Sequence, residues 1–267
     1  MVARVLLIAG SDSGGGAGIQ ADLKTVTALS AYASTAITAL TAQNTLGVQS
    51  IVAIDPSFVA EQMRVVLEDI GADALKTGML HSRAVVETVV YTAQKYAPNV
   101  PLVVDPVMIA KGGAALLETD AVSAVRDVLV PNASVLTPNL PEAEALLDRR
   151  IHTVDDMRAA ARALVEMGAD AVLLKGGHLE GERVVDVLFS EEEGERIFEG
   201  ARIHTRSTHG TGCTLASAVA AGLASKLTLV EAVDRARRYV IEALKQAPGL
   251  GKGHGPLQHG HTVTWFA

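Results

Sequence analysis

Short apolar runs alternate along this chain with segments in which apolar residues recur at helical spacing. The run 2–9 is almost wholly apolar and ends at Gly10, and a continuous run of this length predicts a strand buried on both faces. Ile19, Leu23 and Val26 then follow with the spacing of an amphipathic helix. The alternation continues along the chain and predicts an α/β fold: a mainly parallel central sheet with helices on both faces.

Further segments extend this pattern. Strands are expected at 33–42, 48–54, 73–77, 102–105, 134–137 and 170–175. Helices are expected at 55–70, 82–97, 120–129, from about 139, at 155–167, after residue 213, and at 229–246. Two runs of alternating polarity, 182–190 and 196–203, predict an antiparallel hairpin, and 262–266 an edge strand. No linker or internal repeat interrupts the pattern, so we expect one domain over residues 1–267.

Composition narrows the classes of function. The 267 residues, 49% hydrophobic and 20% charged, fit one large soluble α/β domain. A net charge of −7 argues against a partner that is bulk nucleic acid or an anionic membrane. No apolar run approaches the ~18 residues of a membrane span, and no signal peptide is evident, so we expect a cytoplasmic protein. The single cysteine excludes an internal disulfide and a cysteine-based zinc site.

The chemistry is expected at residues 206–222, where a polar loop becomes a run of small helix formers. Gly210, Thr211 and Gly212 stand at the junction, and the unpaired N–H groups of a first helical turn favour an anion there. Cys213 lies at the same point. A helix N-terminus lowers the pKa of a thiol, which makes Cys213 a candidate base or nucleophile. The alternative is a small buried cysteine that only packs.

The sequence from His209 to Leu215 resembles the anion-hole signature of the ribokinase superfamily. Most of that superfamily has Asp where this chain has Cys213, and the cysteine form resembles the hydroxymethylpyrimidine and phosphomethylpyrimidine kinases of thiamin biosynthesis. Six motifs between Gly10 and Pro256 occur in the order of that family. The resemblance implies a ribokinase-like fold, phosphoryl transfer from ATP to 4-amino-5-hydroxymethyl-2-methylpyrimidine and then to its monophosphate, and a homodimer.

The glycine-rich loop 10–18 follows the first strand, where α/β proteins bind ligands. It lacks the spacing of a dinucleotide-binding fingerprint, and no Walker A sequence occurs. The resemblance implies that this loop closes over the acceptor, and that the acceptor contacts are Gly10, Asp22, Gln43, Met79, Val107 and His209. The amide of Gln43 offers a donor and an acceptor to an aminopyrimidine edge, although a loop cap is the alternative. Met79 is expected to pack on the flat ring, or else to fill the core.

Oxygen ligands recur at successive strand ends. Asp105 closes one strand, and Asn139 and Glu142 match the Asn-x-x-Glu signature of the superfamily. Hard oxygen ligands suit Mg²⁺, so all three are candidate metal residues, with helix capping as the alternative. Lys175 and Thr208 are the expected contacts to the nucleotide phosphates.

Three other functions stay open on the sequence alone. Pyridoxal kinases share the fold, and some also carry cysteine at this position. A Cys–His acyl hydrolase could use Cys213 with His209, but no orienting acid is evident. A regulator of the same fold could bind ligands without catalysis. His254, His259 and His261 form no metal-binding pattern, and we expect them in a solvated tail.

Overall fold

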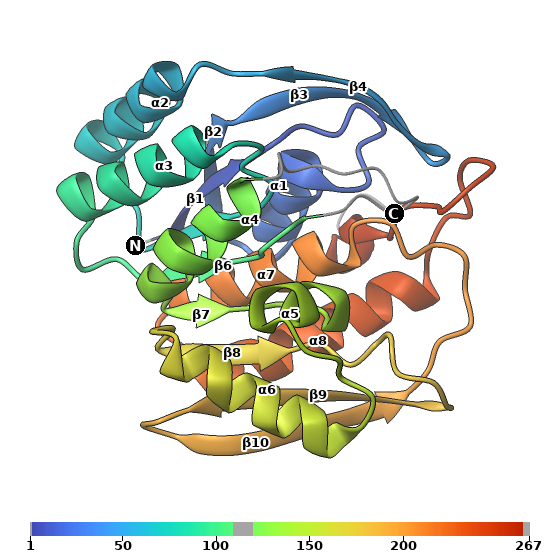
Figure 1. Ribbon diagram of the computed structural model, residues 1–267. Coiled ribbons are helices and arrows are strands. Elements are labelled where there is room, and N and C mark those ends of the chain that lie inside the picture. Colours follow the sequence, from blue (N-terminus) through green and yellow to red (C-terminus); the bar gives the residue numbers. More distant parts are fainter. Residues whose placement is uncertain (1, 109–119, 264–267) are drawn as a thin grey trace.

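Strands from both halves of the chain meet in one sheet. The computed structural model describes residues 2–108 and 120–263, and within them eight strands form a sheet of order β10-β9-β8-β7-β6-β5-β1-β2 (Figure 1). Neighbouring strands from β2 to β8 are parallel, while β9 is antiparallel to β8 and β10. The strands are β1 (Arg4–Ala9), β2 (Tyr32–Ile37), β5 (Ala74–Thr77), β6 (Leu102–Val104), β7 (Val135–Leu136), β8 (Ala171–Leu174), β9 (Arg183–Ser190) and β10 (Gly194–Ala201). The predicted mainly parallel sheet and the hairpin are confirmed.

Helices cover both faces of this sheet, which explains the continuous apolar strands. Val5 and Leu7 of β1 lie in one core, and Leu6 and Ile8 in the other, because successive side chains point to opposite faces. The first core lies under α1 (Gly18–Ala28), α7 (Thr211–Ala224) and α8 (Leu229–Lys245). The second lies under α2 (Pro56–Asp69), α3 (Arg83–Tyr96), α4 (Ala121–Ala124), α5 (Leu140–Leu147) and α6 (Val154–Glu166).

The predicted strand 33–42 is wrong as a single element. The chain leaves the main sheet at Thr38, whose N–H donates to Ala9 and whose hydroxyl donates to the Met79 carbonyl. The following strand, β3 (Ala39–Asn44), pairs only with β4 (Gly47–Ala53) in a separate antiparallel ribbon. Periodicity could not show this break, because both parts are apolar and β-branched.

The predicted helices form, and several begin at residues whose side chains cap them. Asp55 caps α2 and Ser82 caps α3. The helix expected at 120–129 is composite: α4 runs into a π turn, η1 (Val125–Leu129), and then a 3₁₀ turn, η2 (Val130–Asn132). No helix among residues 2–108 and 120–263 is long and apolar enough to cross a membrane.

The histidine-containing end of the chain differs from expectation. His259 begins a 3₁₀ turn, η3 (His259–Thr262), and it is 3% exposed rather than solvated. Its Nε2 lies 2.9 Å from the hydroxyl of Thr214, and its carbonyl accepts from Tyr239. Tertiary contacts with α7 and α8 therefore bury this residue despite its polar neighbours. The expected edge strand 262–266 lies mostly outside the described residues.

Candidate active site

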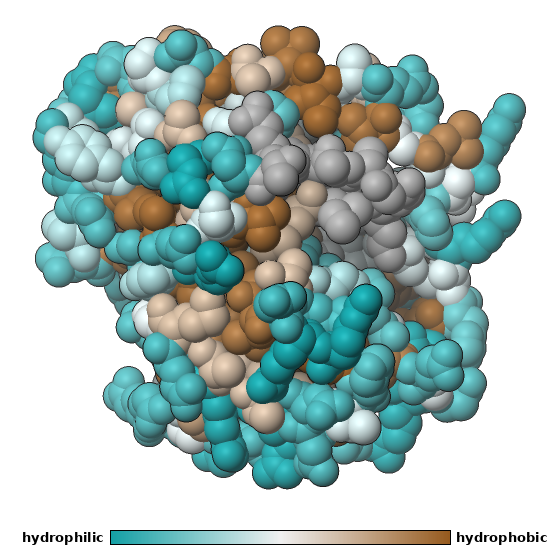
Figure 2. Space-filling view, viewed as in Figure 1, coloured by the Kyte–Doolittle hydropathy of each residue, from teal (hydrophilic) through white to brown (hydrophobic). Residues whose placement is uncertain are grey.

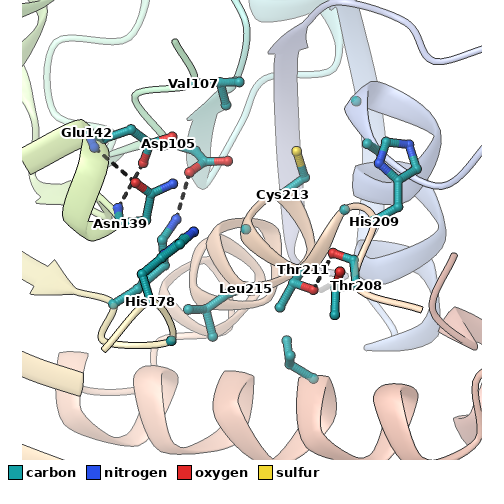
Figure 3. A pocket seen from close by; sticks show the side chains of 18 of the residues that line it. Asp105, Val107, Asn139, Glu142, His178, Thr208, His209, Thr211, Cys213 and Leu215 are labelled. Atoms are coloured by element: carbon teal, nitrogen blue, oxygen red, sulfur yellow. Dashed lines mark hydrogen bonds and ion pairs between the residues drawn. The ribbon is translucent and has the colours of Figure 1, made fainter. Parts of the chain in front are cut away.

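The carboxyl ends of the parallel strands open into a cavity of about 640 Å³. Loops that follow β1, β5, β6, β7 and β8 line it from one side, and the start of α7 and part of α8 from another. In Figure 3, Asp105, Asn139 and Glu142 lie on one side of the cavity, His209 lies on the opposite side, and Cys213 lies between them. Topology therefore brings together residues as far apart in the sequence as Ala9 and Leu244, as expected at this edge of an α/β sheet.

Asp12 organises the glycine-rich loop, and the sequence analysis missed this residue. Its carboxylate accepts from the backbone N–H groups of Gly14, Gly16 and Ala17, and lies 2.8 Å from Nε2 of His209. Burial alone would raise the pKa of Asp12, but its hydrogen bonds and the charge of His209 outweigh burial and hold it below the ordinary value. Asp12 thus joins the loop after β1 to the loop before α7.

Gly210 is required by that junction. It adopts φ of 83° as the N-cap of α7, and a Cβ there would overlap the carbonyl oxygen of Gly16. The hydroxyl of Thr211 donates to the carbonyl of Thr208, which fixes the preceding loop. Gly212 and Cys213 lie in the first turn, where N–H groups have no intrahelical acceptor. The predicted anion-binding geometry is thus present at the cavity.

The charge state of Cys213 corrects the sequence-based expectation. Burial raises the pKa of the thiol to about 12, although Lys76 and the N–H of Gly18 oppose this rise. The helix N-terminus therefore does not make Cys213 a resting thiolate, because the loss of solvent and the charges of Asp105 and Asp22 outweigh it. At neutral pH the residue carries its proton.

A second group of charges lies beside the first turn of α7. Nζ of Lys175 is 3.1 Å from Oδ1 of Asp105, and an added Cβ on Gly212 would lie 3.2 Å from the same ammonium. Burial raises the pKa of Glu142 to about 7, the positive charge of Lys175 opposes this, and the negative charge of Asp105 adds to it. Asp105 and Lys175 directly follow β6 and β8, and Glu142 lies in the first turn of α5, the helix after β7.

Asn139 and Glu142 form the N-terminal capping box of α5. Oδ1 of Asn139 accepts from the Glu142 N–H at 2.9 Å, and Oε2 of Glu142 accepts from the Asn139 N–H at 2.8 Å. The helix-capping alternative for this motif is therefore confirmed. The same Glu142 carboxylate also lies in the cavity wall. No group of three or more His, Cys, Asp or Glu side chains in the described part of the chain could hold a metal. Asp105 and Glu142 are nevertheless among the carboxylates that line the cavity.

The expected acceptor residues separate into two groups. Gly10, Gln43, Met79, Val107 and His209 line the cavity. Asp22 does not: it is fully buried in α1 and paired with Lys76 at 2.7 Å. Asp22 follows the glycine-rich loop in the sequence, but α1 directs its side chain into the core instead of the cavity.

Part of the cavity wall is apolar, and sequence reasoning did not identify it. This part includes Ile203, Leu215, Val240, Ile241 and Leu244. Arg202 closes the neighbouring loop by donating to the carbonyls of Gly177, Leu179 and Gly181. In the sequence these apolar residues match the core pattern of α7 and α8, so only the cavity distinguishes them from the core.

Comparisons with known proteins agree with this arrangement. A family model described as phosphomethylpyrimidine kinase matches residues 12–258. The chain is 49% identical over 259 residues to the hydroxymethylpyrimidine/phosphomethylpyrimidine kinase of Salmonella typhimurium, covering 96% of this chain and 97% of that protein. It is 51% identical over 255 residues to the thiamine biosynthesis bifunctional protein ThiED of Geobacter sulfurreducens. That match covers 96% of this chain but spans only about half, 52%, of the bifunctional protein.

Solved structures give the same picture of the fold. A phosphomethylpyrimidine kinase from Clostridium difficile matches with a TM-score of 0.81 and 41% identity, over 91% of this chain and 100% of that chain. A Bacillus subtilis pyridoxal kinase in complex with ADP matches with a TM-score of 0.89 and 37% identity, over 97% of this chain and 98% of that chain.

Proposed function

The chain belongs to the phosphomethylpyrimidine kinase family, and we propose that the cavity at the start of α7 is its phosphoryl-transfer site. The protein is a hydroxymethylpyrimidine and phosphomethylpyrimidine kinase with the ribokinase-like fold. It uses ATP to phosphorylate 4-amino-5-hydroxymethyl-2-methylpyrimidine and then its monophosphate, which yields the diphosphate for thiamin biosynthesis.

One observation carries the placement of this reaction. The cavity wall holds Gln43, Met79 and His209, the apolar side chains of Leu215 and Val240, and the first turn of α7. We place the pyrimidine against the first three residues and the nucleotide base against the apolar pair. The transferring phosphoryl group then lies at the helix N-terminus, where unpaired N–H groups stabilise negative charge.

Each remaining residue has a role that follows from its position. The phosphoryl group is bound by the backbone N–H groups of Gly210, Thr211, Gly212 and Cys213. Thr208 and Lys175 contact the ATP phosphates, since burial lowers the pKa of Lys175 but the charges of Asp105 and Glu142 outweigh burial and keep it protonated. We place Cys213 beside the acceptor hydroxyl as a protonated thiol. In this form it can position the acceptor. It can act as a base only after the thiol has lost its own proton.

The carboxylate side of the cavity fits Mg²⁺, because Asp105 and Glu142 would supply two hard oxygen donors to such an ion. Asn139 serves this site by holding Glu142 rather than by direct coordination, because its side-chain oxygen caps α5. When bound, the ion neutralises charge on the ATP phosphates.

Pyridoxal kinase is the second candidate, because the pyridoxal kinase structure from Bacillus subtilis matches nearly the whole chain at 37% identity. The two activities share the nucleotide end and differ at the acceptor end. Gln43 favours the pyrimidine, since pyridoxal lacks an adjacent amino donor and ring acceptor.

Assembly and location complete the proposal. The β3–β4 ribbon exposes Leu40, Leu46 and Val52 at 46%, 66% and 61%, and Figure 2 shows hydrophobic residues gathered over this ribbon. Such an apolar face supports a homodimer. A single ribokinase-like domain over residues 1–267, acting on small molecules in the cytoplasm, is part of the same proposal.

A nucleotide-consumption assay separates these functions. Purified protein is given ATP and Mg²⁺ with the hydroxymethylpyrimidine, with its monophosphate, with pyridoxal, or without an acceptor. We expect ADP formation with both pyrimidines and much less with pyridoxal. ADP formation only with pyridoxal would favour the second candidate, and none with any acceptor would contradict a kinase.

A further inference from the structure

A buried ion pair lies beneath the cavity floor. Nζ of Lys76, on β5, is 2.7 Å from Oδ2 of Asp22 on α1, and both side chains are fully buried. The hydroxyl of Ser217, on α7, donates to the other oxygen of Asp22 at 2.7 Å. Three elements that surround the site, β5, α1 and α7, are thus joined through this one carboxylate.

Stability alone does not account for this pair. The desolvation of two charges offsets much of their attraction, and apolar side chains of similar volume are often equally stable in such a place. Apolar residues already fill the neighbouring positions of β5, where Ala74 and Leu75 are fully buried. Folding stability therefore does not explain why a charged pair occupies this position, and the adjoining active site offers a functional reason.

Cys213 precedes Ser217 by four residues on α7, so its thiol lies on the same helix face, one turn from the hydroxyl that bonds Asp22. Burial lowers the pKa of Lys76, but the charge and hydrogen bond of Asp22, with the charge of Asp105, outweigh burial and hold it above the ordinary value. The ammonium is therefore present. Lys175 also interacts with the thiol, and Asp22 and Asp105 oppose its ionisation. Among these charges Lys76 is the one that favours the thiolate most.

We propose that Lys76 is a positioning residue for the first phosphorylation: its buried ammonium is the fixed counter-charge that lets negative charge develop at Cys213 and at the first turn of α7. Asp22 and Ser217 hold the ammonium in place. Asp22, whose sequence position suggested substrate contact, acts on the acceptor only through Lys76. This inference rests on the proposed function for its link to the first step, and on geometry for its link to the thiol.

Alkylation of the only cysteine tests the link to the thiol directly. The full chain without nucleotide is treated with iodoacetamide between about pH 8 and pH 10, where the rate follows the thiolate fraction. The variant is Lys76→Met with Asp22→Asn, which removes both charges together and so leaves no unpaired ion in the core. We expect alkylation roughly 3- to 10-fold slower at each pH, since one pKa unit is a factor of about ten.

A matched control removes an ion pair from the opposite end of β1. Arg4 and Asp73 are paired at 2.9 Å at the amino end of the sheet strands, and Arg4→Met with Asp73→Asn should leave alkylation unchanged. Lys76→Met alone leaves Asp22 as an unpaired anion near the thiol and should slow alkylation more than the double variant. Thermal melting of each variant confirms that the compared proteins are folded.

The two acceptors supply the second readout. The hydroxymethyl group must lose a proton, whereas the monophosphate is already an anion and needs no strong base. Because the thiolate fraction falls roughly 3- to 10-fold, the Lys76→Met/Asp22→Asn variant should lose about the same factor in kcat for the alcohol and almost nothing for the monophosphate. An unchanged alkylation rate, or equal losses for both acceptors, would overturn the proposal. If neither pyrimidine is phosphorylated by the wild type, the proposed function fails, while alkylation still decides the role of Lys76.

Discussion

His209 joins two residues whose chemistry depends on its proton. Its Nε2 lies 2.8 Å from the Asp12 carboxylate and 3.4 Å from the amide nitrogen of Gln43. An ionised carboxylate only accepts, so Nε2 carries the proton and donates it to Asp12. The amide nitrogen of Gln43 can then find no acceptor there, and its N–H groups remain available to a ligand in the cavity.

Gln43→Leu tests this reading of the acceptor end. Loss of the amide would leave the polar edge of the pyrimidine unpaired, at a cost of about 1–3 kcal/mol, or roughly 5- to 150-fold in kcat/KM. The KM for ATP should change little. Gln62→Leu is the control, because its amide bonds only to the backbone of Ile37, away from the cavity. Equal losses with pyridoxal and the pyrimidine would exclude Gln43 as the selective residue.

Cys213→Ala tests the thiol itself. If the thiol takes the proton of the alcohol, its loss should lower kcat for the first step by ~10²–10⁴ and for the second step far less. Because burial raises the pKa of Cys213 to about 12, the thiolate fraction grows about tenfold per pH unit across neutral pH. The wild-type rate of the first step should therefore rise with pH, and this rise should be absent in the variant. Identical pH profiles would show that Cys213 is not the base.

At the scale of elements, one loop and one helix start are each held by a single carboxylate. Asp12 fixes the loop between β1 and α1, and Glu142 fixes the entry to α5. Both side chains also face the cavity. The same groups thus shape the backbone and present charge to ligands, so substitutions must be chosen to separate the two roles.

Asp12→Ala should loosen the loop after β1. The variant loses three hydrogen bonds from backbone N–H groups to a charged acceptor, each worth about 1.5–3 kcal/mol. Amide hydrogen exchange at Gly14, Gly16 and Ala17 should speed up by at least about tenfold, and the KM for the acceptor should rise. Unchanged exchange at these three amides would mean that other contacts hold the loop.

Glu142→Gln separates capping from metal binding. The amide oxygen of glutamine can still accept from the Asn139 N–H, so α5 should form as before, but the charge is gone. The Mg²⁺ concentration for half-maximal rate should rise about tenfold or more, with little change in the acceptor's KM. Asp156→Asn alters the corresponding box of α6 and serves as the control. A Mg²⁺ titration that is the same in both variants would remove Glu142 from the metal site.

At the scale of the molecule, residues near the carboxyl end of the described chain close the active-site edge. His209 donates its backbone N–H to Gly255, and His254 donates to the carbonyl of Thr45 in the turn between β3 and β4. Gly253 packs so closely on Thr45 that a side chain would overlap its carbonyl. The glycine-rich segment 251–256 thereby connects the ribbon to the loop before α7.

His259 should make the folding stability of the protein fall in acid. Burial, with the charges of Lys24 and His261, lowers the pKa of His259 to about 4 from its ordinary 6.5. Below about pH 6.5 the unfolded chain binds a proton that the folded chain does not, so stability should fall as the pH drops from about 6.5 toward 4. Urea unfolding of His259→Gln should show a smaller decline over this range. His204→Gln, at an exposed site, should behave as the wild type, and a wild-type decline in His259→Gln would contradict the assignment.

The sequence by itself determined the elements and the chemistry that lies along one stretch of chain. Buried parallel strands need apolar residues on both faces, so the apolar run predicted β1, and the glycine-rich stretch predicted the start of α7. Cap residues such as Ser82 and Asn139 marked helix starts because they bond to a backbone only three residues away. These features depend on local geometry, which a sequence displays directly.

Only the tertiary structure decided the features that depend on distant neighbours. The pKa of Cys213 follows from burial against Asp105 and Asp22, which outweighs the helix terminus that the sequence shows. Asp22 pairs with Lys76, 54 positions away, instead of facing the cavity. His259 is buried by α7 and α8 although its neighbours are polar. Desolvation and charge act through space, and periodicity along a chain carries no record of which charges share a buried volume.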